Sequence, residues 1–270
     1  MTSPTSIDYA LRLSPPAAQP ALAALRNWWR EVAGVAREVS DPAVAAAKLA
    51  WWRRELQTGW AGMPQHPSLQ ALKRMAPDLA VGRLLSVVDA AQEQAQQTRF
   101  LDEAALLRWA ADQGGAALAA AGEILAATAG RSPLALPEAC ARLGSACALA
   151  AAVRGLGRHM QAGHLPVPVS ELQHTGLRAH ELLGRSPALL QDARYRAVMD
   201  IQAARARRLL QEAMQAVLTA GPRRDTRGLR VLGALRLALL DELQRSGYPV
   251  LQQHVMLSPV RRAWIAATTW

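Results

Sequence analysis

Four times along the chain, a residue able to cap a helix stands directly before a proline: Asp41-Pro42, Ser132-Pro133, Ser186-Pro187 and Ser258-Pro259. The capping oxygen accepts a hydrogen bond from the first helical turn, where proline loses nothing by lacking an N–H. The stretches between these pairs are rich in helix-favouring residues, with alanine at 56 of the 270 positions. Aromatic residues make up only 4% of the chain, and valine and isoleucine are sparse, which disfavours strands. We therefore expect an all-α protein.

The helix signals divide the chain without any long linker. They predict helices near residues 17–39, 42–60, 68–95, 102–129, 137–161, 171–183, 187–219, 226–246 and 259–267. Asp102 and Ser170 are weaker capping signals within this series. No Gly/Ser-rich tether, composition break or repeat of 20–50 residues interrupts the sequence. Residues 1–270 are therefore predicted to form one domain.

Membrane and export signals are weak in this sequence. The longest uncharged apolar stretch, 143–153, falls short of the roughly 20 residues that a membrane span needs. The first sixteen residues have neither a basic start nor a continuous apolar segment. Cys140 and Cys147 lie seven residues apart, too far for a disulfide on one helix, and are expected to be buried thiols. We expect a protein without a transmembrane segment that is cytoplasmic, either free or peripheral to the membrane.

The formal net charge is +10, and 29 of the 31 basic residues are arginine. Such a surface attracts anions, including phosphorylated ligands and the headgroups of a membrane surface. No zinc-finger spacing or RNA-binding aromatic signature is present, so specific nucleic-acid binding is not expected. The arginines of 187–219 are expected to form a solvated outer face: Arg194, Arg196, Arg205, Arg207 and Arg208.

Several segments together resemble one known family. Residues 39–56 resemble the second helix of squalene/phytoene synthases, and Asp8 to Pro16 resembles their opening segment. Residues 143–154, with Gly163 and Pro168 after them, resemble the central helix and its following loop. The tail from Tyr248 to Arg262 also fits. The resemblance implies a single-domain isoprenoid synthase fold, with a central cavity for isoprenoid chains.

In that family, two aspartate-rich motifs face each other across the cavity and bind Mg²⁺, which stabilises departure of a diphosphate. This sequence departs from the family at both motifs. The first motif falls on Ala33, Gly34 and Arg37, and the acidic positions of the second fall on Gly155, Arg158 and His159. Ala148 and Ala151 stand where a glutamine and an asparagine usually precede the second motif. We expect neither a metal site nor catalytic residues, although the family uses Mg²⁺.

The substitutions also introduce positive charge. Arg37, Arg154, Arg158 and His159 are candidates to bind an anion directly, with guanidinium groups replacing the metal. The alternative is that these side chains turn outward or pair with Glu38.

The resulting hypothesis is a degenerate family member without catalysis. It would bind an isoprenoid or lipid, or a protein partner, as an inactive synthase subunit or an assembly factor. For the last role the resemblance offers a precedent, a mitochondrial complex I assembly factor of this fold. The competing hypothesis is a prenyltransferase that condenses two farnesyl or geranylgeranyl diphosphates head-to-head.

Overall fold

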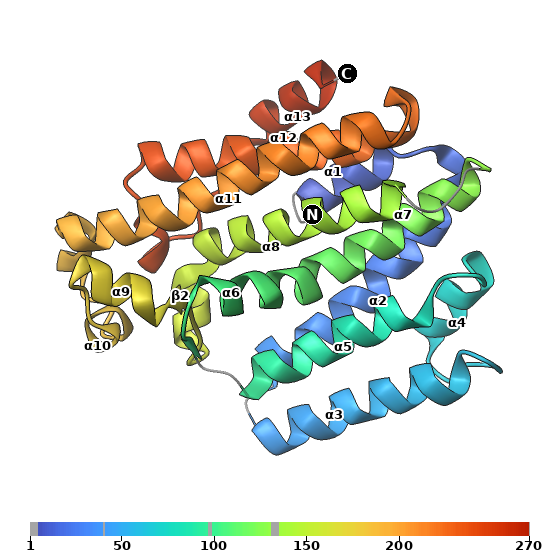
Figure 1. Ribbon diagram of the computed structural model, residues 1–270, viewed down its shortest axis with the longest axis horizontal. Coiled ribbons are helices and arrows are strands. Elements are labelled where there is room, and N and C mark those ends of the chain that lie inside the picture. Colours follow the sequence, from blue (N-terminus) through green and yellow to red (C-terminus); the bar gives the residue numbers. More distant parts are fainter. Residues whose placement is uncertain (1–4, 40, 97–98, 131–134, 270) are drawn as a thin grey trace.

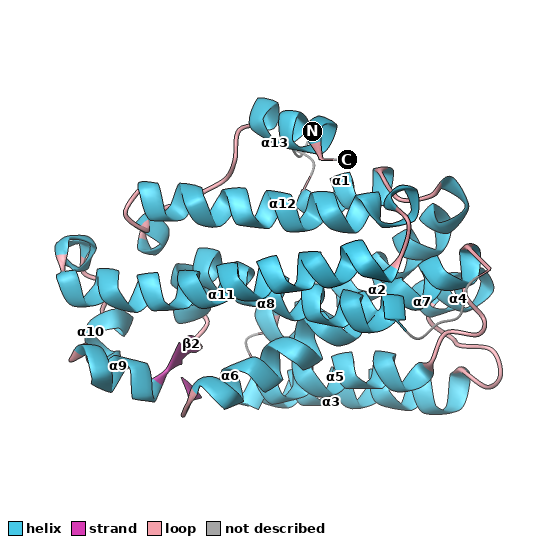
Figure 2. Cartoon of the chain, turned by 45° about the horizontal axis from the view of Figure 1, so that its top comes forward, coloured by secondary structure: helices cyan, strands magenta, loops and turns pink. Residues whose placement is uncertain are grey.

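The computed structural model describes residues 5–39, 41–96, 99–130 and 135–269, with the side chains of Arg37 and Glu38 outside the description. Its helices are α1 (Ser6–Arg12), α2 (Gln19–Glu38), α3 (Pro42–Arg54), α4 (Pro67–Met75), α5 (Val81–Gln96), α6 (Glu103–Ala110), α7 (Ala116–Thr128), α8 (Ala135–Gln161), α9 (Val169–Thr175), α10 (Ala179–Leu183), α11 (Ala193–Ala220), α12 (Arg223–Arg245) and α13 (Pro259–Thr268). Two short parallel strands, β1 (Arg99–Phe100) and β2 (Leu165–Pro168), pair beside α6 and α9 (Figure 2). The predicted all-α fold is confirmed.

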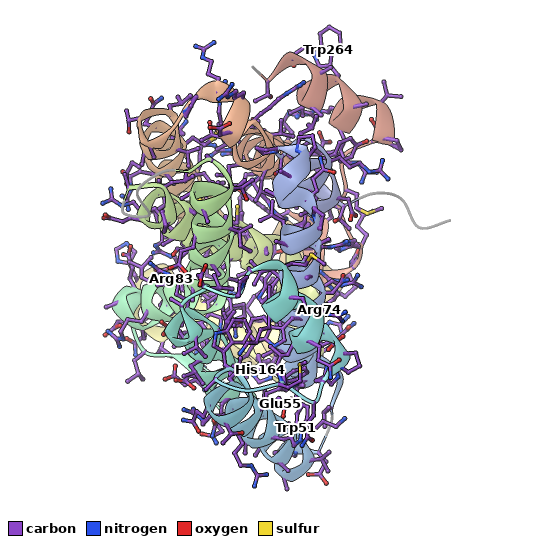
Figure 3. All side chains as sticks on the ribbon, turned by 90° about the vertical axis from the view of Figure 1, so that its right-hand side faces the viewer. Trp51, Glu55, Arg74, Arg83, His164 and Trp264 are labelled. Atoms are coloured by element: carbon purple, nitrogen blue, oxygen red, sulfur yellow. The ribbon has the colours of Figure 1, made fainter. Side chains whose placement is uncertain are left out.

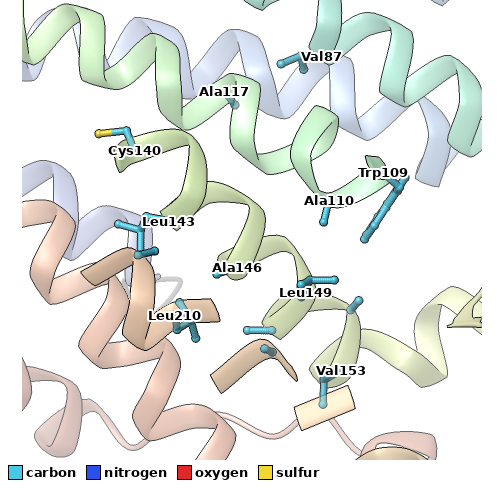
Figure 4. Close-up of a cluster of buried hydrophobic side chains, with 14 of the residues drawn as sticks. Val87, Trp109, Ala110, Ala117, Cys140, Leu143, Ala146, Leu149, Val153 and Leu210 are labelled. Atoms are coloured by element: carbon cyan, nitrogen blue, oxygen red, sulfur yellow. The ribbon is translucent and has the colours of Figure 1, made fainter. Parts of the chain in front are cut away.

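Helix α8 lies at the centre of the helical layers. It packs against α7 on one side and against α11 and α12 on the other (Figure 1). Figure 4 shows Leu143, Ala146 and Leu149 of α8 in the core beside Leu210 of α11. Because α8 is buried on several sides, most of its residues are alanine, glycine and leucine rather than an amphipathic alternation.

Glycines bring α8 and the segment before α7 into backbone contact. A Cβ placed on Gly114 would lie 2.3 Å from the Gly144 carbonyl oxygen, far closer than any real side chain allows. Gly114 belongs to a π-helical turn, Ala111–Gly115, that joins α6 to α7. Gly114 and Gly144 therefore allow the two helical segments to approach closely.

Most of the predicted caps are observed. Asp41 and Asp102 accept backbone N–H bonds at the starts of α3 and α6, and Ser258 does so at α13. Ser186 caps a 3₁₀ turn instead of an α-helix, and α11 begins afterwards with Asp192 as its cap. Ser132-Pro133 lies outside the described residues.

Three expected boundaries were wrong. The helix expected over 68–95 is two helices, because Ala76 leaves the helical region (φ −145°, ψ 69°) before Pro77. The helix expected over 171–183 is broken by Gly176 in the left-handed region at φ +70°. It also begins at Val169 after Pro168, so Ser170 is not its cap.

Helix α1 was not expected from the sequence, and a capping box between Thr5 and Asp8 starts it. The expectation of no transmembrane segment stays a prediction. Within the described residues, α8 is long and apolar enough to cross a membrane by length and composition. However, 67% of its most apolar 18-residue stretch is buried inside the protein. Core helices of soluble proteins can be equally long and apolar.

The tryptophan pairs divide as expected for neighbouring helical positions. Trp28 and Trp52 are buried in the core, and their rings meet edge to face at 6.5 Å. Trp29 and Trp51 are partly buried, Trp29 against a cavity and Trp51 against His66. Figure 3 shows Trp51 near Glu55 at the opposite end of the molecule from Trp264. Cys140 and Cys147 are free thiols.

Candidate functional site

A cavity of about 230 Å³ lies between α1, α2, α7, α8 and α12. This exceeds by more than tenfold the roughly 10–15 Å³ that a single water needs on the same measure. Its wall is mainly aliphatic and aromatic, with Leu22, Leu25, Trp29, Trp109 and Leu232 among the larger side chains. Among the described residues, none that lines the cavity carries a carboxylate. The cavity is therefore suited to an apolar chain rather than to a hydrated metal ion.

Small residues on two helices open this space. On α8, Gly144, Ala148 and Ala151 line the cavity at helical spacing, and His159 continues the same face. On α2, Ala33 lines it two turns beyond Leu25 and Arg26. Because alanine and glycine occupy positions where the family resemblance implies polar ligands, the wall there is apolar and recessed.

Five of the six predicted motif positions can be placed completely, the exception being Arg37, whose side chain lies outside the described residues. Ala33 and His159 line the cavity, while Gly34 and Gly155 are buried in their helices. The ring of His159 lies over Gly155, at 3.3 Å from where a Cβ would stand.

The predicted arginines are placed only in part. Arg158 is exposed, with one guanidinium nitrogen 3.6 Å from the same point over Gly155. Arg154 is half-buried one turn before it on α8. Arg37 lies on α2 one turn after Ala33, but its side chain is outside the described residues.

Arg236 on α12 is the guanidinium that the sequence reasoning missed. It is 9% exposed and lines the cavity beside Cys147, where its charge opposes the rise that burial causes in the pKa of that thiol. On α12 it replaces an apolar residue in a stripe that includes Leu229, Leu232 and Leu239. An arginine within an apolar helical stripe is the signal that could have identified it.

Arg154, Arg158 and Arg236 form a cluster of like charge. Burial lowers the pKa of Arg154 to about 10, and the charges of Arg236 and Arg158 add to this effect. Partial burial and the charges of Arg154 and Arg158 also lower the pKa of His254. The Nε atoms of Arg154 and Arg236 are buried and have no hydrogen-bond partner among the described residues. Such a cluster gains most from an anion that accepts these donors.

The second cation on the cavity wall is balanced. Arg26 of α2 forms a 2.7 Å ion pair with Asp8 of α1, which fixes α1 over the cavity. In the described part of the chain, no carboxylate pairs with Arg154, Arg158 or Arg236. The uncompensated charge therefore lies where α8 and α12 meet.

The described residues do not fit the Mg²⁺ sites that the fold family uses. Mg²⁺ requires oxygen ligands, usually carboxylates. The cavity lining provides none, and no group of three or more potential ligands from His, Cys, Asp and Glu occurs among the described residues. The guanidinium cluster also repels a dication from this end of the cavity.

The family model for squalene/phytoene synthase matches residues 3–261. This chain belongs to the squalene/phytoene synthase family. A search of curated proteins gives no match.

Solved structures share the squalene/phytoene synthase fold with this chain. A dehydrosqualene synthase in complex with ligand is 16% identical, with a TM-score of 0.84 over 98% of this chain and 90% of that one. Squalene synthase HpnC from Alicyclobacillus acidocaldarius is 18% identical, with a TM-score of 0.75 over 89% and 88%. YisP from Bacillus subtilis is 18% identical, with a TM-score of 0.64 over 97% and 96%. At these identities the likeness concerns the fold alone.

Proposed function

We propose that this squalene/phytoene synthase-family chain is a non-catalytic binder of an isoprenoid or similar lipid chain with an anionic head. The apolar cavity takes the chain. Arg154 and Arg236 bind the head directly, in the role that metal ions have elsewhere in the family. The observation that carries this proposal is the pair of buried Nε atoms, in Arg154 and Arg236, without an acidic partner in the described residues.

The balance of energies supports binding over catalysis. Two cations desolvated side by side lower stability unless an anion compensates them. An allylic diphosphate ionises only if its leaving group is strongly stabilised, and a metal clamp supplies several kcal/mol of that stabilisation. Each 1.36 kcal/mol corresponds to about tenfold in rate, so loss of two clamps removes many powers of ten.

Affinity for a non-ionisable thio-analogue of farnesyl diphosphate, measured by calorimetry with excess EDTA and again with Mg²⁺, tests the proposal. We expect equal affinity in both conditions and much weaker binding of farnesol, which lacks the anion. Arg154→Met and Arg236→Met should each weaken binding roughly 10- to 100-fold, the value of a charge-assisted hydrogen bond. Arg208→Met is the matched control, since Arg208 is an exposed arginine that pairs with Glu212 outside the cavity.

Two outcomes would reject this function. Absence of binding in both conditions removes the lipid-binder proposal and leaves a protein partner as the role of the scaffold. Release of pyrophosphate from farnesyl or geranylgeranyl diphosphate with Mg²⁺, above a heat-killed control, establishes the prenyltransferase alternative instead.

A further inference from the structure

Three large apolar side chains near the C-terminus face solvent. Met256, Val260 and Trp264 are 58%, 79% and 69% exposed. They are spaced by four residues, and Val260 and Trp264 therefore lie on one side of α13. Figure 3 shows Trp264 at the outer edge of the molecule, pointing away from it. We call these three residues the α13 patch.

The opposite side of α13 fixes the helix to the body. Arg262 and Ala266 are buried, and Ser258 caps the helix through the Arg261 N–H. Arg261 forms an ion pair with Glu242 of α12, and Arg227 donates a hydrogen bond to the Ala266 carbonyl oxygen. The patch is therefore held outward by both ends of the helix.

The surroundings of the patch are strongly basic. Residues 223–268 contain eight arginines and three acidic residues, so they provide half of the net charge of +10. Arg223, Arg227 and Arg230 lie along one face of α12. The pKa of Arg230 is lowered, first by its burial and then by the nearby charges of Arg223 and Arg227. The contact of Arg227 with Ala266 places this face beside α13.

The acidic groups of this region offset little of that charge. Glu242 is already paired with both Arg245 and Arg261, and Asp225 is buried. Arg224 is 85% exposed at the start of α12 and forms an ion pair with Asp225. Arg230, Arg236 and Arg262 are buried, whereas Arg223 and Arg224 are exposed, so these two cations face solvent near the apolar strip.

We propose that the α13 patch docks onto a bilayer rich in anionic phospholipid, with Trp264 and Val260 entering the interfacial layer and the exposed Arg223 and Arg224 of α12 on the headgroups. A short helix with an outward tryptophan and adjacent arginines has the composition of an interfacial segment. A second copy of the chain fits less well. Symmetric contact would bring like-charged arginines together, and three side chains bury far less than the roughly 1,200 Å² of a stable interface.

Docking in this orientation places the cavity near lipid. Helix α12, on which α13 packs, also contributes Leu229, Leu232 and Arg236 to the cavity wall. Membrane contact goes beyond the proposed lipid binding and does not depend on it, because no residue of the α13 patch lines the cavity.

Co-sedimentation with vesicles tests this docking. We compare phosphatidylcholine alone with phosphatidylcholine mixed with phosphatidylglycerol. We expect binding to the anionic vesicles only, and at least tenfold weaker binding for the double variant Val260→Ser/Trp264→Ser. Arg223→Gln and Arg224→Gln should each weaken it about fivefold. The matched control is Met63→Ser, which removes an equally exposed apolar side chain (75%) outside the patch.

Thermal unfolding of each variant and calorimetry with the farnesyl thio-analogue separate docking from folding and from cavity binding. The double variant should keep the wild-type midpoint and ligand affinity. The proposal is overturned if the double variant sediments with anionic vesicles as strongly as the wild type does. It is also overturned if the wild type binds neutral and anionic vesicles equally. A dimer in gel filtration that the double variant converts to monomer overturns it too, since the patch would then bind a second copy.

Discussion

Arg205 and Arg236 are both buried arginines on long core helices, and their surroundings are opposite in charge. Arg205 of α11 forms ion pairs with Glu103, at 2.9 Å, and with the largely buried Glu171. Only its Nη1 atom lacks a partner. Arg236 of α12 instead faces Arg154 and a neutral thiol. The comparison separates a cation that stabilises the fold from one that is available to a ligand.

We expect the largest effect on stability at Arg205, whose charge is balanced by two carboxylates. Arg205→Leu leaves Glu171 buried without its cation, and we expect a loss of about 3–5 kcal/mol in the free energy of unfolding. Urea denaturation measures it. Arg208→Leu on the same helix removes an exposed pair with Glu212 and should change stability by no more than about 0.5 kcal/mol. Equal losses in the two variants would break the comparison.

Giving Arg236 an acidic partner should make the two sites alike. Cys147→Asp places a carboxylate where the thiol now lies beside Arg236, and should be more stable than Cys147→Asn by about 1–3 kcal/mol at neutral pH. Arg236 lowers the folded pKa of that carboxyl, so the advantage exists above its unfolded pKa and disappears as pH falls through the folded value. Urea denaturation at neutral and acidic pH checks this. Cys147→Asp should also bind the farnesyl thio-analogue less tightly than Cys147→Asn.

Removing the uncompensated charge should cost little. In Arg236→Met, the repulsion from Arg154 and the unpartnered Nε both disappear, which offsets the lost packing. We expect the free energy of unfolding to stay within about 1 kcal/mol of wild type, on either side. A loss as large as that of Arg205→Leu would mean that Arg236 has a structural role. The same urea series includes both variants.

The smallest effect is a pH dependence of the thiol beside Arg236. Burial raises the pKa of Cys147 to about 11, from 9.0, although Arg236 lowers it in part. As the pH rises, the unfolded chain therefore loses this proton before the folded protein does. The contribution to the free energy of unfolding is fully present below pH 9 and falls as the pH rises toward 11. By pH 10 we expect Cys147 to have lowered the free energy of unfolding by about 1 kcal/mol. In Cys147→Ala this loss should be absent, and only the contribution of Cys140 should remain. Urea midpoints at pH 8, 9 and 10 measure it.

The fold was largely predictable because its signals are local. Asp41, Asp102 and Ser258 cap helices where the sequence predicts them. The break before Pro77 was missed because the apolar pattern continues through it on both sides. Helix α1 was missed because seven residues are too few for a periodic signal.

The site was predictable only where it lies on one helix. The pattern around Gly155 predicts Arg154, Arg158 and His159 as anion-binding candidates, and all three lie on α8. Their role in binding stays a prediction. Arg236 comes from a helix about 80 residues later, and only tertiary packing brings it to Arg154. Arg205 was expected on a solvated face, but two carboxylates from other segments pair with it in the core. Pairing of distant charges leaves no mark on local sequence.

The glycine crossing at Gly114 and Gly144 also limits how the chamber can be redesigned. At this crossing the two backbones are in contact and neither glycine has a side chain that could be shortened, so no substitution there can enlarge the cavity. Room for a bulkier guest must come from the aromatic boundary, by shortening Trp29 or Trp109. Any alanine introduced at the crossing would instead push the central helices apart and change the shape of the whole chamber.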